Sequence, residues 1–222
     1  MLTALVATAS LAQVSATASV VSDDRVRGVS ISDGGPAGQV DVSYDHDSGW
    51  YAGGFASNVQ FYDHSRQELQ FIGYTGFARR IRNGWSLDAG AAYSTFSRFK
   101  DYNYLELHAG VTANAVSVRL YLSPNYFGQS IHTLYLELNG SYRLTEHFKL
   151  IGHGGLVQAF AGATDDYGGS HPHPDFLAGV EYRLQPFALQ VGRVFSDGAG
   201  QVYPVAANHT GGVLTARLSA TF

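Results

Sequence analysis

Hydrophobic and polar residues alternate along most of the chain. In the last ten residues, Leu214, Leu218 and Phe222 occupy even positions, whereas Thr215 and Arg217 occupy odd positions. The same alternation runs through other segments, among them 104–112, 116–122 and 133–143. A period of two residues is typical of a β-strand with two chemically different faces.

About twelve segments show this strand pattern, and the connections between them alternate in length. The short connections include Asn83-Gly84, the strongest two-residue hairpin signal, and the long ones include 161–174 and 197–211. Short turns at one end and long loops at the other are typical of up-and-down barrels in the bacterial outer membrane. The predicted strands are 20–32, 37–46, 50–61, 67–82, 85–96, 103–113, 116–126, 132–144, 148–160, 175–184, 187–196 and 212–222.

Which face points inward decides the fold class. A soluble sandwich turns its apolar face inward, whereas a transmembrane barrel turns it toward lipid and lines its lumen with polar residues. Strands of ten or more residues suit a tilted membrane span, and aromatic residues such as Trp50, Trp85 and Tyr126 lie near segment ends, as in interfacial girdles. We therefore predict an all-β fold, a transmembrane antiparallel up-and-down β-barrel of about 12 strands, with a secreted soluble sandwich as the alternative.

The N-terminal segment resembles an export signal. Residues 1–12 are almost all small or apolar, and Ala16-Thr17-Ala18 has the small-x-small form of a signal-peptidase site. No Lys or Arg precedes Arg25, which indicates a truncated basic region. We predict a signal peptide at 1–18 and a barrel domain at 19–222, with the alternative that this segment is an ordinary first strand.

Composition and charge exclude several classes of function. The 222 residues include 26 Gly and 14 Tyr but no Cys, and only 14% are charged, with a net charge of -4. The sequence has no basic block, so it offers no positively charged surface to which nucleic acid would bind. Without Cys, disulfides, thiolate zinc sites and cysteine nucleophiles are excluded.

Charged residues on the predicted inner face are the candidate pore lining. Seven are basic and four are acidic, which suggests a weak preference for anionic solutes. The alternative is that these residues pair across strands and brace a narrow lumen without selecting anything. The predicted pore-lining residues, with two histidines beside them, are Arg25, Arg27, Asp88, Glu106, His108, Arg119, Glu137, Arg143, Lys149, His153, Glu181, Arg183 and Arg217.

Other chemical motifs are weak. His171 and His173 could hold a metal together with His209 and the nearby pair Asp165-Asp166, but solvated loop histidines are the more ordinary interpretation, so no metal is predicted. Asp45-His46-Asp47 is expected to form a turn rather than an acid-base site. The Gly-x-Ser-x-Gly motif that would indicate a hydrolase does not occur in the sequence, and no cofactor is predicted.

One arginine breaks the alternation. Arg193 shares its parity with the apolar Leu189 and Val191. It is expected either to extend toward a membrane interface or to mark a bulge that changes the register.

Part of the chain resembles a known family. The stretch from Ser22 to Asp33, SDDRVRGVSISD, with Pro36-Ala37 after it, resembles the opening of the TorF-like porins, small bacterial outer-membrane barrels. Residues 47–53 and 56–59 continue the match, and weaker similarity runs on to Phe222. The resemblance implies an outer-membrane channel. A terminal aromatic after alternating apolar residues also resembles the signal read by the barrel-assembly machinery.

These observations predict a monomeric, non-enzymatic channel in the bacterial outer membrane for passive diffusion of small hydrophilic solutes. The expected partners are membrane lipid, the solutes and, through Phe222, the assembly machinery. The alternatives are an enzymatic barrel such as a lipase or protease, and a closed barrel whose loops bind a partner as an adhesin does.

Overall fold

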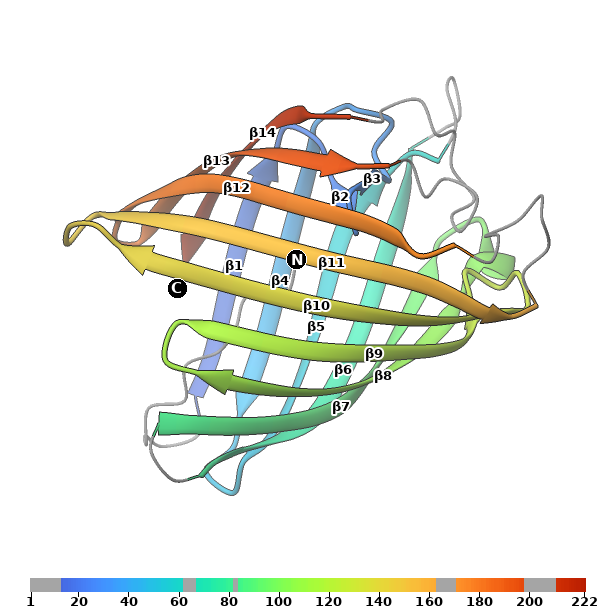
Figure 1. Cartoon of the computed structure of the whole chain (residues 1–222), viewed down its shortest axis with the longest axis horizontal. Coiled ribbons are helices and arrows are strands. Elements are labelled where there is room, and N and C mark those ends of the chain that lie inside the picture. The colour runs from blue at the N-terminus through green and yellow to red at the C-terminus, as the bar shows by residue number, and fades with distance from the viewer. Residues whose placement is uncertain (1–12, 62–66, 82–83, 163–170, 198–210) are drawn as a thin grey trace.

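Twelve antiparallel strands close into one barrel (Figure 1). The computed structural model describes residues 13–61, 67–81, 84–162, 171–197 and 211–222. The barrel strands are β1 (Gln13–Val21), β4 (Ala37–Asp45), β5 (Trp50–Val59), β6 (Glu68–Arg80), β7 (Trp85–Phe96), β8 (Tyr104–Ala113), β9 (Val116–Tyr126), β10 (Ile131–Arg143), β11 (Phe148–Ala161), β12 (His173–Leu184), β13 (Phe187–Ser196) and β14 (Val213–Thr221). The prediction of an all-β antiparallel barrel is confirmed.

Two small elements lie outside the barrel wall. Strands β2 (Arg25–Val26) and β3 (Val29–Ser30) form a two-stranded hairpin between β1 and β4. The short 3-10 turn η2 (Lys100–Tyr102) follows β7. Among the described residues, no helix is long and apolar enough to cross a membrane.

Each barrel strand pairs with its neighbours in the chain, and β1 closes the barrel against β14. Thr17 lies opposite Thr221, and their side-chain hydroxyl oxygens are 3.0 Å apart. The brief connections 46–49, 114–115 and 185–186 lie at one end of the barrel, which we call the short-turn end. The connections 22–36, 97–103 and 127–130 lie at the opposite end, which we call the long-loop end.

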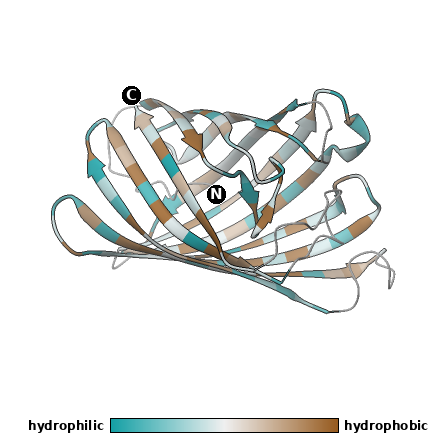
Figure 2. Ribbon diagram, turned by 90° about the horizontal axis from the view of Figure 1, so that it is seen from above, coloured by the Kyte–Doolittle hydropathy of each residue, from teal (hydrophilic) through white to brown (hydrophobic). Residues whose placement is uncertain are grey.

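The apolar face of the strands points outward. In β10, Leu134, Leu136 and Leu138 are exposed, whereas Thr133 and Glu137, which alternate with them, are buried. Figure 2 shows the same alternation of hydrophobic and hydrophilic residues along the ribbons. A soluble sandwich would bury its leucines instead, so the predicted orientation of the two faces is confirmed.

The predicted first strand, 20–32, is wrong. The first strand is Gln13–Val21, and residues 22–36 leave the wall to form the β2–β3 hairpin. The error arises because two short antiparallel strands joined by a tight turn show the same local period of two as one longer strand. The number of strands in the barrel is unchanged, because β1 takes the place of the misplaced strand.

The small-x-small motif Ala16-Thr17-Ala18 lies within β1. These residues pair with Val40 to Val42 on β4, and Ala18 also pairs with Ala220 on β14. Cleavage after Ala18 therefore stays a prediction, and it would remove Gln13 to Ala18 from the strand that closes the barrel. Residues 1–12 of the predicted signal peptide lie outside the described residues.

Two further sequence interpretations can be compared with the fold. His46 to Gly49 form the turn between β4 and β5, where the Ser48 backbone N–H donates to His46 Nδ1 at 3.1 Å, so the turn at Asp45-His46-Asp47 is confirmed. Arg193 points outward near the long-loop end, over the ring of Phe195 at 5.3 Å. The register of β13 against β12 is continuous there, so Arg193 marks no bulge.

Candidate functional site

The barrel lumen is the candidate functional site, and the β2–β3 hairpin crosses it. The hairpin turns at Arg27 and Gly28, whose φ angles of 51° and 78° are both positive, as in the two-residue turns that suit tight hairpins. Gly28 lies against the wall, where a Cβ would come within 2.8 Å of Asp175 on β12 and 2.7 Å of Ser196 on β13. This position therefore requires glycine both for its backbone conformation and for the close approach.

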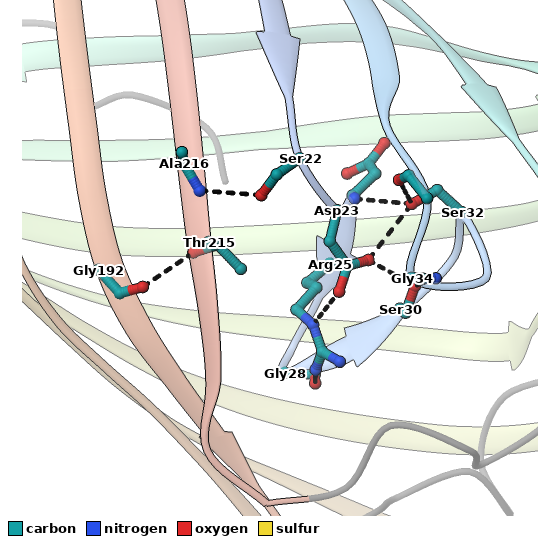
Figure 3. Close-up of polar contacts among 12 residues, drawn as sticks. Ser22, Asp23, Arg25, Gly28, Ser30, Ser32, Gly34, Gly192, Thr215 and Ala216 are labelled. Atoms are coloured by element: carbon teal, nitrogen blue, oxygen red, sulfur yellow. Dashed lines mark hydrogen bonds and ion pairs between the residues drawn. The ribbon is translucent and has the colours of Figure 1, made fainter.

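A hydrogen-bond network holds the root of the hairpin (Figure 3). The Ser30 hydroxyl donates to Asp23 Oδ1 at 2.6 Å, and Arg25 Nε donates to Asp23 Oδ2 at 2.6 Å. The Asp24 backbone N–H donates to the Ser32 hydroxyl at 2.8 Å. Since these buried polar groups all have hydrogen-bond partners, the base of the hairpin is held in a defined position inside the lumen.

The tip of the hairpin reaches strands on the far side of the barrel. The Arg27 guanidinium donates to Glu106 on β8 and lies over the rings of Tyr135 on β10, at 4.2 Å, and Tyr126 on β9, at 4.9 Å. In the order of strands around the barrel, β8, β9 and β10 lie opposite β1 and β4. A buried ion pair and stacked aromatic rings therefore fix the hairpin across the lumen.

An apolar cluster fills the long-loop half of the lumen. Val29 and Ile31 of the hairpin belong to one buried cluster with residues from the long-loop ends of the strands. The other buried members are Val59, Phe61, Phe96, Tyr104, Tyr126, Phe127, Tyr135 and Val157. This half of the barrel is therefore packed in the manner of a protein core, around the hairpin.

The short-turn half has a different, polar lining. Asp88 on β7 accepts from Arg119 Nε at 3.0 Å and lies 3.4 Å from His108 Nε2. His108 in turn lies 2.9 Å from the hydroxyl of Tyr51 on β5. The side chains of Asp88, His108 and Arg119 keep 10%, 11% and 16% of their surface exposed, whereas Tyr135 in the packed half is 2% exposed, so the short-turn half is the more open one.

Large side chains lie flat on the inner wall over glycines. A Cβ at Gly76 would overlap the Tyr51 hydroxyl, and one at Gly155 would overlap the Tyr135 hydroxyl. Glycine in a strand permits such a close approach, at the cost of weaker strand propensity.

A second charged cluster lies toward the short-turn end. Glu181 on β12 is 3.3 Å from Lys149 Nζ, 3.0 Å from an Arg183 guanidinium nitrogen and 2.8 Å from Gln190 Nε2. Between the two halves, His153 Nε2 lies 2.8 Å from Asp175 Oδ1 and 3.0 Å from the Tyr135 hydroxyl.

The structure places the predicted inner-face residues as follows. The strand residues Asp88, Glu106, His108, Arg119, Glu137, Arg143, Lys149, His153, Glu181, Arg183 and Arg217 lie at inward positions, alternating with outward apolar ones. Arg25 and Arg27 lie on the hairpin inside the lumen rather than on a barrel strand. Whether these residues line a conducting pore stays a prediction.

Sequence reasoning missed several inward carboxylates. Asp41 alternates with Val40 and Val42 on β4, so the period of two could have found it. Glu68 and Asp175 stand at strand ends, where parity is harder to assign. The sequence pattern could not place Asp23 and Asp24 in the lumen, because their position there depends on the hairpin that follows them.

Ion pairs account for many of the inner charges, in line with the bracing interpretation. Arg27 pairs with Glu106, Arg119 with Asp88, and Lys149 with Glu181. Arg143 is exposed at the short-turn end of β10.

The loop histidines show no metal centre among the described residues. His173 Nδ1 lies 3.1 Å from Asp197 Oδ2, and His171 is exposed. No group of three or more His, Asp or Glu residues in the described part of the chain could hold a metal ion. His209, Asp165 and Asp166 lie outside that part.

The barrel resembles solved porins. The NanC porin superposes with a TM-score of 0.63 over 95% of this chain and 99% of that chain, at 11% identity. The KdgM porin superposes with a TM-score of 0.57 over 94% of this chain and 98% of that chain, at 12% identity. Identities this low show a shared fold alone. No curated protein matches the sequence.

A family model matches nearly the whole chain. Its description is "Bacterial protein of unknown function (Gcw_chp)", and the match covers residues 6–221. The match includes all twelve barrel strands and the hairpin that crosses the lumen. The chain therefore belongs to the Gcw_chp family of bacterial proteins.

Proposed function

We propose that this protein is a passive channel in the bacterial outer membrane for small hydrophilic solutes. The observation that carries the proposal is the closed barrel with apolar side chains outward and charged side chains inward. A closed barrel is the one form of β-sheet that satisfies every backbone hydrogen bond in lipid. Twelve strands exceed the eight or so at which side chains from the wall alone fill the interior, so room for a solute depends on how far the hairpin narrows the lumen.

The comparisons support the proposal at the level of fold. The two porins share the barrel over almost the full length of both chains. The resemblance to the TorF-like porins, which begins at Ser22 and covers the hairpin, adds support for the same function. Export by the signal at 1–18, a monomeric state and recognition of Phe222 by the assembly machinery belong to the same proposal.

The hairpin is the constriction of the proposed channel. It occupies the long-loop half of the lumen, so a solute passes beside it before it reaches the polar short-turn half. No bound cofactor is needed, since polar side chains replace part of the hydration of the solute and transport follows its gradient.

One observation favours a second function, a closed barrel whose long-loop end binds a partner. The apolar cluster around Val29 and Ile31 is buried inside the barrel, and Ile31 is only 1% exposed. If this packing seals the lumen, the barrel carries no current and only its surface can act.

Conductance in planar lipid bilayers separates the two functions. The wild-type protein is expected to conduct. A variant with residues 25–30 replaced by an Asn-Gly turn is expected to conduct more, because the constriction is shortened. The replacement suits the local geometry, because the Ile31 backbone N–H already donates to the Asp24 carbonyl at 2.8 Å, across the neck of the hairpin.

The outcomes are distinct. Current from both proteins, larger in the shortened variant, supports a channel constricted by the hairpin. A silent wild-type protein with a conducting variant supports the closed barrel instead. Silence of both refutes the channel. Glu146→Gln, in an exposed turn outside the lumen, is the control and is expected to conduct as the wild type does.

A further inference from the structure

The fixed charge of the constriction differs from the charge that the sequence suggested. Both hairpin arginines already have carboxylate partners. Arg25 pairs with Asp23 at 2.6 Å, and Arg27 pairs with Glu106. Their positive charges are therefore compensated, and other groups decide the net charge of this part of the lumen.

Three further carboxylates face the packed half and accept hydrogen bonds chiefly from neutral donors. Asp24 accepts from the hydroxyl of Ser57. Glu68 Oε2 accepts from two backbone N–H groups, at 2.9 and 3.2 Å. Asp175 Oδ2 accepts from a tyrosine hydroxyl at 3.1 Å. Neutral donors satisfy the carboxylate oxygens but bring no positive charge to offset that of an ionised carboxylate.

Unpartnered oxygen acceptors lie in the same region. Gln39 Oε1 and Glu68 Oε1 are buried and have no hydrogen-bond partner among the described residues. Gln39 points inward and lies in register between Ser19 on β1 and Ser57 on β5, the donor to Asp24. Buried acceptor oxygens without donors attract a cation or a water molecule and repel an anion.

The positive groups nearby do not reverse this balance. Arg217 interacts electrostatically with both Asp24 and Asp41, so one guanidinium faces two carboxylates. His153, beside Asp175, adds a positive charge only when it is protonated.

Across the hairpin, the wall it touches and the adjoining layer, carboxylates outnumber arginines. The carboxylates are Asp23, Asp24, Asp41, Glu68, Glu106 and Asp175, and the arginines are Arg25, Arg27 and Arg217.

We infer that the constriction prefers small cations and cationic hydrophilic solutes. The inference rests on the proposed channel and replaces the weak anion preference that the sequence suggested. That preference arose from counting seven basic against four acidic residues, without Asp23, Asp24, Asp41, Glu68 and Asp175. In a narrow passage, the net fixed charge biases which ions enter.

The test is the reversal potential of the wild-type channel in a potassium chloride gradient. Potassium is expected to be more permeant than chloride. Asp24→Asn and Asp175→Asn, which keep an acceptor oxygen, are each expected to lower the potassium-to-chloride permeability ratio by about twofold or more, since little salt screens charges in a narrow lumen. Glu146→Gln removes the same charge from an exposed turn and is expected to leave the ratio unchanged.

The reversal potential of the wild-type channel tests the inference even if neither Asn variant folds. A wild-type channel that prefers chloride, or that does not discriminate, overturns the inference and leaves the channel intact. Asn variants that fold and keep the wild-type ratio also overturn it, because the preference then arises elsewhere. A silent wild-type protein refutes the proposed function itself, and with it this inference.

Discussion

Replacement of one outward leucine by arginine tests the orientation on which the proposed function rests. Leu136 lies in the middle of β10, points outward and is 46% exposed. Its cross-strand neighbours, Leu120 on β9 and Leu156 on β11, are also exposed apolar residues. If this surface meets lipid, the side chain at position 136 lies near the hydrocarbon midplane.

The expected cost of Leu136→Arg is large. An arginine on the lipid face of a barrel costs about 2–4 kcal/mol at the midplane. Each 1.4 kcal/mol is tenfold in an equilibrium constant, so the folding equilibrium constant should fall by roughly 30-fold to 700-fold. In an aqueous environment an exposed leucine would tolerate arginine with a change of about 0.5 kcal/mol or less.

The assay is urea unfolding of protein refolded into phosphatidylcholine vesicles, followed by tryptophan fluorescence. Trp50 and Trp85 are the two tryptophans of the chain, and both are exposed at the short-turn ends of their strands. Their emission should therefore report the transfer of the barrel from lipid to water.

Two controls isolate the effect of the lipid face. Glu137→Gln alters the adjacent, inward residue and keeps the oxygen that accepts from Asn139 Nδ2 at 2.7 Å, so it should cost less than about 1 kcal/mol. Glu146→Arg places an arginine in an exposed turn and should cost about 0.5 kcal/mol or less. Equal losses from Leu136→Arg and Glu137→Gln would refute the assignment of the two faces.

Two further predictions use the same urea titration. Gly155→Ala should cost about 1–3 kcal/mol, because its Cβ would overlap the Tyr135 hydroxyl, whereas Gly140→Ala, with no atom within 4 Å of its Cβ, should change stability by less than about 1 kcal/mol; similar losses from both would contradict the packing described for the lumen. Arg27→Ala removes one partner of the buried pair with Glu106 and should cost about 3–5 kcal/mol, and a loss below about 1 kcal/mol would show that the hairpin is not held across the lumen in this way.

The sequence alone determined the class of fold and the orientation of its faces. Leucines such as Leu134 and Leu138 recur at every second position, and local alternation is a property that each strand carries by itself. Eleven of the twelve strand segments could be recognised in this way. Their order around the barrel could also be predicted, because consecutive antiparallel strands joined by short connections lie next to each other.

Only the tertiary structure decided what fills the lumen. The sequence pattern predicts the segment 20–32 as one strand, and its turn at Arg27-Gly28 becomes decisive only when strands distant in sequence supply Glu106 and Tyr135 as contacts. The pairing of charges across the barrel, and therefore the net charge of the constriction, depends on the same long-range closure. A periodic pattern records which side of the wall a residue faces, whereas the residue that it meets across the lumen is set by the arrangement of all twelve strands.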